Sequence, residues 1–593
     1  MPDADVPSGN LAFDLCNALF RALYRLGLRH VVISPGSRST PLVLAASVHP
    51  GLEKHVILDE RSAAFTALGI GKATGRPAVL VCTSGTALAN YFPAVIEARM
   101  SGVPLLLATA DRPPQLVGTG ANQTIRQDEL YGDYPVRYAS LLSDGITPEE
   151  TGELARKLWN AAREGRGPAH LNAPFDKPLE PDSDRLEEAN DANARQVREV
   201  EAEERPGVEW GEARPAAVPD LAPGGDEKAG HIVPEAPLAV VIQGPLSPME
   251  DPGAAARLAR RLNAPLLSET GGDSSALHDT SDGTAVTGFE GFLRDGEARR
   301  ELRPQLILRF GFQPVSKALE YALRAWEGVP HWHLAHPSNS HDITVSVTRR
   351  LAWDGHSEPD CRLQPAGPDW LAGWRAREEE YARRRGEVLG SRNGETGSDG
   401  THLGDGQLYH RLLPQVPPDW FAFFSNSFPV RDRLLCGPPL ASPAFVSRGA
   451  SGIDGITSTA MGIALASGKT GVLFTGDLAF LHDTNALLGG QLPSQPLIVI
   501  IVNNGGGSIF RMLPIAERGE VFRLYFETPQ QADIRSMAGS YGLPYTRIET
   551  PSELSSLDLQ ELARQTGRGL HLVECRTDAE YAMNLRRRLW GIA

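Results

Sequence analysis

The stretch from Gly471 to Leu513 constrains the fold of this chain more than any other. It contains two apolar, β-branched runs, Val472–Phe474 and Leu497–Val502, which have the composition of buried parallel strands. The segment between them, His482–Gly490, has the length and composition of a crossover helix. Strand, helix and strand in this order predict an α/β fold with a parallel sheet.

Both predicted strands end in polar residues. The first ends at Gly476-Asp477, and the second at Asn503-Asn504 followed by three glycines, Gly505–Gly507. Carboxyl ends of neighbouring parallel strands meet at one edge of a sheet, where α/β folds bind their ligands. A carboxylate and an amide carbonyl offer hard oxygen ligands, and the glycines allow close backbone approach. The pattern predicts a Mg²⁺ ion carrying a diphosphate, although these residues alone also fit an ordinary strand-to-helix turn.

The same alternation of strands and helices recurs along most of the chain. A length of 593 residues indicates three or four domains, each able to bury a core. We predict an α/β protein of three doubly wound domains with mainly parallel sheets. The other expected strands are His30–Ile33, Glu53–Leu58, Ala78–Cys82, Pro104–Ala108, Ala169–Asn172, Leu238–Ile242, Pro304–Phe310, Val329–Leu334, Trp420–Phe424 and Leu570–Cys575.

Two changes in composition indicate domain boundaries. Residues 183–234 are acidic and rich in Ala, Pro and Gly, which predicts a partly disordered linker. The Gly/Ser/Asn-rich segment Gly390–Gly406 predicts a second boundary, and the charged segment Trp370–Arg385 before it predicts a solvated helix. The expected domains are 1–182, 235–389 (a central α/β domain) and 390–593.

Charge and cysteine content exclude several classes of protein. The 58 basic and 73 acidic side chains give a formal charge of −15, which argues against binding nucleic acid. No apolar run reaches the ~20 residues that a membrane span needs, and the polar amino terminus is not a signal peptide. The five cysteines lack CxxC spacing and fit reduced thiols in a cytoplasmic protein. An anionic substrate would need a local cluster of arginines to reverse the field.

One loop near the amino terminus fits such an anion site. The segment SPGSRSTPL places Ser37 and Arg38 between a strand and a helix that begins near Thr40-Pro41. Hydroxyls, helix-terminal amides and a guanidinium together can bind a carboxylate. A surface turn with a solvated arginine explains these residues equally well.

Seven motifs in order resemble one family of thiamine-diphosphate enzymes. They are SPGSRSTPL, DERSAAFTALGIGKATG, TSGTALAN, DRPP, GANQ, SRGASGIDG and GDLAFLHDTNAL. Together with the Gly-Asp…Asn-Asn pattern they resemble the MenD family, the 2-succinyl-5-enolpyruvyl-6-hydroxy-3-cyclohexene-1-carboxylate synthases (EC 2.2.1.9) of menaquinone biosynthesis. The resemblance implies the three-domain thiamine-diphosphate-enzyme architecture, with a pyrimidine-binding domain first and a diphosphate-binding domain last.

The resemblance also implies a set of cofactor-binding residues. Glu60 would be the catalytic carboxylate that contacts the pyrimidine ring of thiamine diphosphate, which calls for an apolar setting that raises its pKa. Mg²⁺, for which Mn²⁺ can substitute, would be held by Asp477, Asn504 and the Gly506 carbonyl. Ile453 would impose the bent shape of the cofactor. The remaining cofactor contacts would be Leu478, where many relatives have glycine, and the apolar residues Ile509, Phe510 and Leu513.

The implied reaction takes two dianionic substrates. It decarboxylates 2-oxoglutarate and transfers the resulting succinyl-semialdehyde carbanion to isochorismate. Many relatives have a second basic residue after Lys317, where this chain has Ala318, which puts the contribution of the middle domain in doubt. The implied substrate-binding residues are Ser37, Arg38, Arg112, Asn122, Gln123, Lys317, Ser427, Arg431 and Arg448.

In this family each active site combines the residue matching Glu60 from one subunit with the metal site of another. The resemblance therefore implies a homodimer with shared active sites. It also implies a homotetramer, which is the assembly expected for the family. An acetolactate-synthase-like carboligase or another 2-oxoacid decarboxylase is an alternative, although decarboxylases commonly carry a His-His pair that this chain lacks. A non-catalytic paralogue is a third possibility, and it would be expected to lose Glu60 or Asp477.

Overall fold

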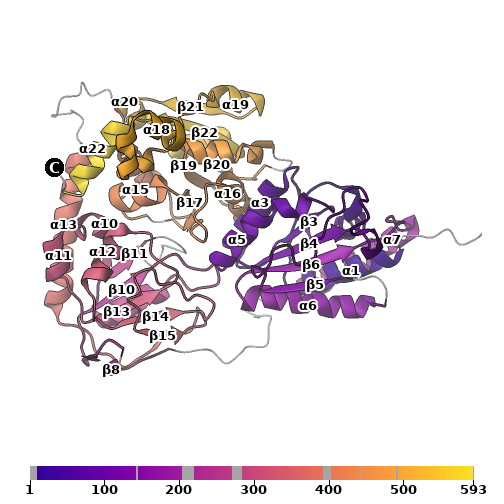
Figure 1. Cartoon of the computed structure of the whole chain (residues 1–593), viewed down its shortest axis with the longest axis horizontal. Coiled ribbons are helices and arrows are strands. Elements are labelled where there is room, and N and C mark those ends of the chain that lie inside the picture. Colours follow the sequence, from indigo (N-terminus) through magenta and orange to yellow (C-terminus); the bar gives the residue numbers. More distant parts are fainter. Residues whose placement is uncertain are drawn as a thin grey trace, which may run out of the picture. The chain divides into compact units, whose positions relative to one another are not determined.

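Three six-stranded sheets, in which every neighbouring pair of strands is parallel, form the framework of the chain (Figure 1). In this computed structural model the described residues are 10–141, 145–203, 219–226, 228–269, 283–390, 402–440, 442–488 and 492–591. They divide into two units. The first is Met1–Ala213 with Gly449–Gly468 and Asp483–Leu492, and the second is Arg214–Arg448 with Lys469–His482 and Pro493–Ala593.

The first unit is built on the sheet β2-β1-β3-β4-β6-β5. The strands are β1 (His30–Ile33), β2 (Glu53–Val56), β3 (Val79–Cys82), β4 (Leu105–Asp111), β5 (Arg137–Ser140) and β6 (Pro168–Pro174). The helices are α1 (Asn10–Arg25), α2 (Thr40–Ser47), α3 (Glu60–Thr74), α4 (Ala87–Asn90), α5 (Phe92–Met100), α6 (Pro148–Glu164) and α7 (Ser183–Glu203), together with α16 (Ile456–Ser467).

Alternating residues of these strands enter two separate cores. Val31 packs in the core that includes α1, α2 and α6, whereas Val32 packs in the core that includes α3 and α5. Successive side chains of a strand point to opposite faces, so helices cover both faces of this sheet. The doubly wound fold predicted for this part of the chain is therefore confirmed.

The predicted linker begins with an ordered helix. Helix α7 places Ala189 and Val200 in the core shared with α1, and the Asn193 side chain donates to Asn17 Oδ1 at 3.0 Å. The prediction treated residues 183–234 as a partly disordered linker, and the structure instead forms a helix over residues 183–203. Apolar side chains at helical spacing dock this helix, namely Leu186, Ala189, Val197 and Val200. Residues 204–218 lie outside the described part of the chain.

The second unit contains the other two large sheets. The middle sheet has the order β12-β11-β10-β13-β14-β15, and the last sheet β18-β17-β19-β20-β22-β21. The middle strands are β10 (Ala239–Gln243), β11 (Leu266–Ser268), β12 (Ala285–Val286), β13 (Leu306–Phe310), β14 (His331–Ala335) and β15 (Arg349–Ala352). The last six are β17 (Phe421–Phe424), β18 (Ala444–Val446), β19 (Gly471–Gly476), β20 (Pro496–Asn503), β21 (Tyr545–Ile548) and β22 (Gly569–Arg576).

Helix α13 (Pro368–Gly390) joins the cores of these two sheets. Its Trp370, Trp374 and Tyr381 are buried, and the Tyr381 hydroxyl donates to the Leu435 carbonyl at 2.7 Å. The prediction of a solvated helix was wrong, because this helix buries its aromatic side chains and also Arg385, whose Nη1 donates to the Gly437 carbonyl at 3.0 Å. Aromatic residues on the inner face fix the middle sheet against the last one.

The crossover between β19 and β20 differs from the expected helix. Helix α17 (Asp477–His482) starts directly at the strand end, and a 3-10 helix, η5 (Thr484–Leu488), follows it. The helix was predicted to begin only at His482. Asp477 therefore lies in the first helical turn, where backbone N–H groups surround its carboxylate. Among the described residues, no helix is both long enough and apolar enough to span a membrane.

Candidate cofactor and substrate site

The polar ends of β19 and β20 come together in the second unit, as predicted. Gly476 pairs with Val502, so Asp477 and Asn504 follow strand ends that lie side by side. The Asp477 carboxylate accepts the Leu478 N–H at 2.8 Å and also a hydrogen bond from the Gly506 N–H. The loop after β20 therefore folds back over Asp477.

The donors at this edge fit a divalent cation. Asp477 is 5% exposed, and no basic side chain of the described chain forms a salt bridge with it. Burial raises the pKa of Asp477 to about 6, opposed by the two backbone hydrogen bonds. An ionised carboxylate here lacks a counter-charge, which a bound cation would supply.

Glycine backbone lines the space beside this carboxylate. Gly505 and Gly506 have φ values of +83° and +124°, which favour glycine. A Cβ atom on Gly506 would lie 2.0 Å from the Glu527 carbonyl oxygen, whereas one on Gly476 or Gly505 would meet no protein atom within 4 Å. Open space next to bare backbone suits a diphosphate.

Asp405 orients the side chain of Asn504, and sequence reasoning missed it. Asn504 Nδ2 donates to Asp405 Oδ2 at 3.1 Å, which leaves Oδ1 as the outward oxygen, accepting only the Ser508 hydroxyl at 3.0 Å. Asp405 is itself fixed by Thr577 and by the buried Arg586, whose Nη2 lies 2.6 Å from Asp405 Oδ2. No spacing pattern indicates Asp405, because the contact joins residues 99 positions apart.

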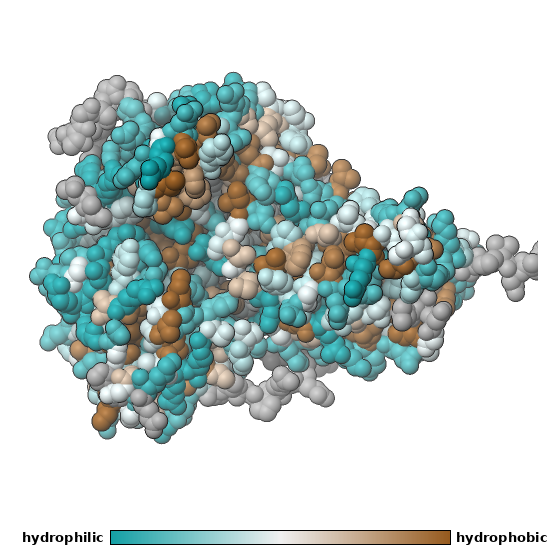
Figure 2. Space-filling view, in the orientation of Figure 1, coloured by the Kyte–Doolittle hydropathy of each residue, from teal (hydrophilic) through white to brown (hydrophobic). Residues whose placement is uncertain are grey.

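The apolar residues expected around the cofactor are partly exposed. Ile509 and Phe510 lie in a 3-10 helix, η6 (Ser508–Met512), and Leu513 follows it. Phe510 is 37% and Leu513 is 50% exposed, whereas Leu478 is half-buried. Figure 2 shows further apolar surface around α18 (Glu520–Phe522), in the same region of the chain. These side chains are available to contact a ligand or a second chain.

Arg431 and Arg448 are anchored by the loops that carry them. Ser427 adopts φ +71°, rare outside glycine, and its carbonyl accepts Arg431 Nη1 at 2.6 Å. Arg448 Nη1 donates to Asn426 Oδ1 at 3.1 Å. Burial lowers the pKa of Arg431. Both guanidinium groups are only partly buried and are held in place before any substrate binds.

Lys317 and Ala318 differ in surroundings. Lys317 is exposed, and its ammonium group pairs with Glu320 at 2.7 Å. Ala318 is fully buried in the core of the middle sheet, so a long basic side chain would not fit there. The structure therefore gives a packing reason for the departure at 318.

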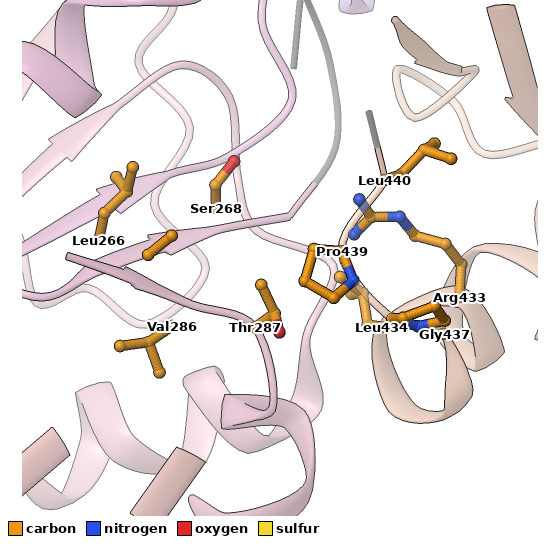
Figure 3. Close-up of a pocket in the computed structure, with 11 residues that line it drawn as sticks. Leu266, Ser268, Val286, Thr287, Arg433, Leu434, Gly437, Pro439 and Leu440 are labelled. Carbon is orange, nitrogen blue, oxygen red and sulfur yellow. The ribbon is translucent and has the colours of Figure 1, made fainter. Parts of the chain in front are cut away.

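The pocket drawn in Figure 3 lies between the middle sheet and α15 (Phe428–Cys436). Leu266, Val286 and Thr287 line one side, and Arg433 and Leu434 the other. Its free volume of about 30 Å³ holds a water molecule rather than a dicarboxylate substrate. None of the predicted site residues lines it.

In the first unit, Glu60 begins α3 directly after Asp59, the N-cap residue. Asp59 Oδ1 accepts the backbone N–H groups of Arg61 and Ser62 at 2.8 and 3.2 Å. The Glu60 carboxylate is half-buried and accepts Asn90 Nδ2 at 3.4 Å. The cap fixes the backbone while the Glu60 side chain stays accessible.

Arg38 and Arg112 lie close together in the same unit. Arg38 is 6% exposed and donates through Nη1 to the Phe175 carbonyl at 2.7 Å. Burial lowers the pKa of Arg38, and the charge of Arg112 lowers it further. Within the described residues neither guanidinium forms a salt bridge, so an anion could bind between them. Ser37 is exposed at the start of the same loop.

Gln123 is fixed on the neighbouring loop by two hydrogen bonds with Ser84. Gln123 Nε2 donates to the Ser84 carbonyl, and the Ser84 hydroxyl donates back to the Gln123 carbonyl, both at 3.0 Å. Asn122 beside it is exposed. Ile453 is 37% exposed in the loop before α16, where Gly455 adopts φ +64°. Each predicted residue of this unit thus lies in a loop after a strand or at a helix start.

A buried ion pair that sequence reasoning missed holds the loop after Arg448. Glu97 on α5 accepts the Gly449 N–H at 3.0 Å and the Ala450 N–H at 2.7 Å. Lys72 on α3 lies 3.9 Å from the same carboxylate, and both side chains are less than a tenth exposed. The sequence signal for this pair is that Lys72 and Glu97 are charged residues within otherwise apolar stretches of α3 and α5.

Two comparisons with known proteins agree with this geometry. Residues 13–130 match the family described as "Thiamine pyrophosphate enzyme, N-terminal TPP binding domain", and residues 443–575 match its "C-terminal TPP binding domain". Proteins called 2-succinyl-5-enolpyruvyl-6-hydroxy-3-cyclohexene-1-carboxylate synthase are similar over almost the whole chain. One from Pelodictyon phaeoclathratiforme is 36% identical, covering 91% of this chain and 89% of its own length. Others from Rubrobacter xylanophilus (36%) and Geobacillus kaustophilus (35%) cover 96% and 97% of this chain, and 96% of their own length in both cases.

Proposed function

The chain belongs to the family of 2-succinyl-5-enolpyruvyl-6-hydroxy-3-cyclohexene-1-carboxylate synthases, and from this membership we propose that it catalyses the reaction for which they are named. It decarboxylates 2-oxoglutarate and transfers the succinyl-semialdehyde unit to isochorismate, in menaquinone biosynthesis. The observation that carries this proposal is the similarity to these synthases over nearly the full length of both chains.

Thiamine diphosphate is the cofactor, since both of its binding domains match. When bound, it supplies a nucleophilic carbon that attacks 2-oxo acids and allows CO₂ to leave. The Asp477 carboxylate, the Asn504 side-chain oxygen and the Gly506 carbonyl are suited to hold Mg²⁺, or Mn²⁺ in its place. Asp405 keeps the oxygen of Asn504, not its NH₂ group, turned toward the ion.

Glu60 holds and returns a proton at the pyrimidine ring. The Glu60 carboxylate lies at the start of a helix whose backbone is fixed by Asp59. It is therefore held in position without forming an ion pair in the described part of the chain, and it can exchange a proton. Leu478, Ile453, Ile509, Phe510 and Leu513 form the apolar wall and exclude water. Their partial exposure supports this role, because a side chain already packed in a core would have no surface left for the cofactor.

The arginines bind the substrate carboxylates. Arg38 and Arg112 form one cationic pair, and Arg431 with Arg448 supplies guanidinium groups in the other unit. Ser37, Asn122, Gln123 and Ser427 add neutral hydrogen-bonding groups. Lys317 is the weakest member of this set, because Glu320 already neutralises it.

Self-association is part of the proposal, because the family resemblance implies active sites that are shared between two chains. We propose a homodimer in which each active site combines Glu60 of one chain with Asp477 of another, and a homotetramer as its further assembly. The exposed apolar side chains of Val521, Leu524 and Tyr525 support a covered surface in that assembly.

We also propose three functional domains, residues 1–182, 235–389 and 390–593, with residues 183–234 as the connection between the first two. The proposed location of the protein is the cytoplasm.

The decisive experiment is an assay of the purified chain with thiamine diphosphate, Mg²⁺, 2-oxoglutarate and isochorismate. We expect CO₂ release coupled to consumption of isochorismate, with the product identified by mass spectrometry. Pyruvate in place of 2-oxoglutarate tests the acetolactate-type alternative and is expected to give no turnover. Cofactor binding without any turnover would instead indicate a non-catalytic paralogue.

A further inference from the structure

Three potential metal ligands of the first unit have no part in the proposed reaction. His30 begins β1, and Glu53 and His55 lie on β2, the edge strand of the sheet. The strands are parallel with His30 opposite Glu53 and Val32 opposite His55. Because side chains alternate along a strand, all three project from one face of the sheet.

Their ligand atoms form a compact cluster. His30 Nδ1 lies 3.1 Å from His55 Nε2 and 3.6 Å from Glu53 Oε2, and the three ligand atoms all lie within 4.8 Å of one another. Metal–ligand bonds of 2.0–2.2 Å in a tetrahedral site place neighbouring ligand atoms about 3.4 Å apart. The two distances from His30 Nδ1 lie on either side of this value, and the third distance, between His55 and Glu53, is at most 4.8 Å.

The chemical state of the ligands also suits a metal. Imidazole coordinates only when it is neutral. Burial lowers the pKa of His30 to about 4, with a smaller contribution from His55, while Glu53 opposes the shift and Arg29 adds to it. Arg29 itself is turned toward the Tyr24 and Leu28 carbonyls. Burial thus favours an uncharged His30 at neutral pH.

The exposure of the three residues leaves the cluster open on one side. His55 is buried, the His30 side chain is 12% exposed, and the Glu53 side chain is 63% exposed. An ion could enter from the Glu53 side and keep a water molecule as its fourth ligand. Two imidazoles and one carboxylate suit Zn²⁺ and its first-row neighbours, whereas Mg²⁺ prefers oxygen ligands throughout.

We propose that His30, Glu53 and His55 form a site for one Zn²⁺-like divalent cation, separate from the Mg²⁺ site at Asp477. The ion would join the edge strand β2 to β1. Since β2 leads through Asp59 into Glu60, the cross-link would stabilise the part of the sheet that carries the catalytic carboxylate.

The test uses the full chain, stripped with a chelator and reloaded with thiamine diphosphate and excess Mg²⁺. Zn²⁺ is titrated by calorimetry, and Co²⁺ by visible absorption, which reports tetrahedral nitrogen and oxygen ligands. We expect one tightly bound equivalent per chain and a raised unfolding temperature. Glu53→Gln and His30→Gln should each weaken binding by tenfold or more. Glu53 is exposed, so its replacement tests the ligand without endangering the fold.

Two controls separate this site from other binding. His402→Gln removes a histidine that pairs with Asp578 outside the proposed site, and it should leave binding unchanged. Asp477→Asn removes the proposed Mg²⁺ ligand, and the Co²⁺ spectrum should survive it. The proposal is overturned if no equivalent binds, if Glu53→Gln and His30→Gln bind as tightly as the parent chain, or if Asp477→Asn abolishes the signal. The contact between His30 and His55 would then be an imidazole–imidazole hydrogen bond within the fold.

Discussion

Asn504 donates its side-chain N–H to Asp405, and this one bond determines which atom of Asn504 can face a cation. The Nδ2···Oδ2 distance is 3.1 Å, and Asp405 is fixed from behind by Arg586 and Thr577. An amide in the opposite orientation would present N–H groups to the ion and repel it. The ligand set proposed for Mg²⁺ therefore depends on a buried aspartate outside it.

Replacement of Asp405 should weaken Mg²⁺ binding. We expect Asp405→Ala to raise the dissociation constant for Mg²⁺ about 10–100-fold, measured by calorimetry with thiamine diphosphate present. Asp405→Asn keeps an acceptor and should have a smaller effect. Asp419→Asn, at an exposed position, is the control. If Asp405→Ala lowered only the free energy of unfolding and bound Mg²⁺ normally, the orienting role would be refuted.

Glu60→Gln should separate catalysis from cofactor binding. The amide fills the same volume but cannot exchange a proton with the pyrimidine ring, so we expect most turnover to be lost while thiamine diphosphate still binds. CO₂ release measures the first effect, and calorimetric titration with the cofactor measures the second. Glu149→Gln, in the first turn of α6, is the control. Equal activity in Glu60→Gln would exclude the proposed proton transfer.

Loss of one member of the Lys72–Glu97 pair should destabilise the first unit. Lys72→Met leaves the Glu97 carboxylate buried without its counter-charge, which costs about 3–5 kcal/mol in the free energy of unfolding. Urea unfolding measures this cost. Lys157→Met on the exposed face of α6 should change little. The double variant Lys72→Met/Glu97→Gln should recover part of the loss, and an unchanged midpoint in Lys72→Met would show that the pair contributes nothing.

The sequence predicted the features of the fold and site that depend on neighbouring residues. Asp477 and the glycines after β20 were placed correctly because a polar residue after a buried parallel strand must lie at the sheet edge. The short edge strand β5 was missed because its residues are half-exposed and include Arg137.

The missed features depend on contacts between distant parts of the chain. Asp405 acquires its role only when α14 (Asp405–Leu412) packs beside the loop after β20. The acidic composition of residues 183–203 suggested disorder, yet a few apolar residues at helical spacing dock α7 against α1. Similarly, α13 packs in the core through Trp370 and Trp374 although its sequence is rich in charged residues. Composition averages over both faces of a helix, whereas packing depends on one.

Glu269 should make the second unit less stable as pH rises. Its carboxylate is 1% exposed and accepts the Ser316 N–H at 2.6 Å. Burial raises the pKa of Glu269 to about 7, and the charge of Glu290 raises it further. The backbone hydrogen bonds from Val315 and Ser316 and the charge of Arg448 act in the opposite direction. Between pH 4.5 and 7 the folded chain therefore keeps a proton that the unfolded chain has lost. Stability falls with pH across this window, by an amount on the order of 3 kcal/mol in total.

Glu269→Gln isolates this effect from all other titrating groups. The buried histidines act in the opposite direction, since burial lowers the pKa of residues such as His333, so the profile of the parent chain alone is not diagnostic. The difference in free energy of unfolding between Glu269→Gln and the parent should instead shift steadily in favour of the variant from pH 4.5 to 7 and then level off. Urea unfolding at half-unit pH steps measures this difference. Glu379→Gln, at an exposed position, is the control. A difference that is constant with pH would mean that Glu269 binds its proton equally in the folded and unfolded chains, which would contradict the prediction.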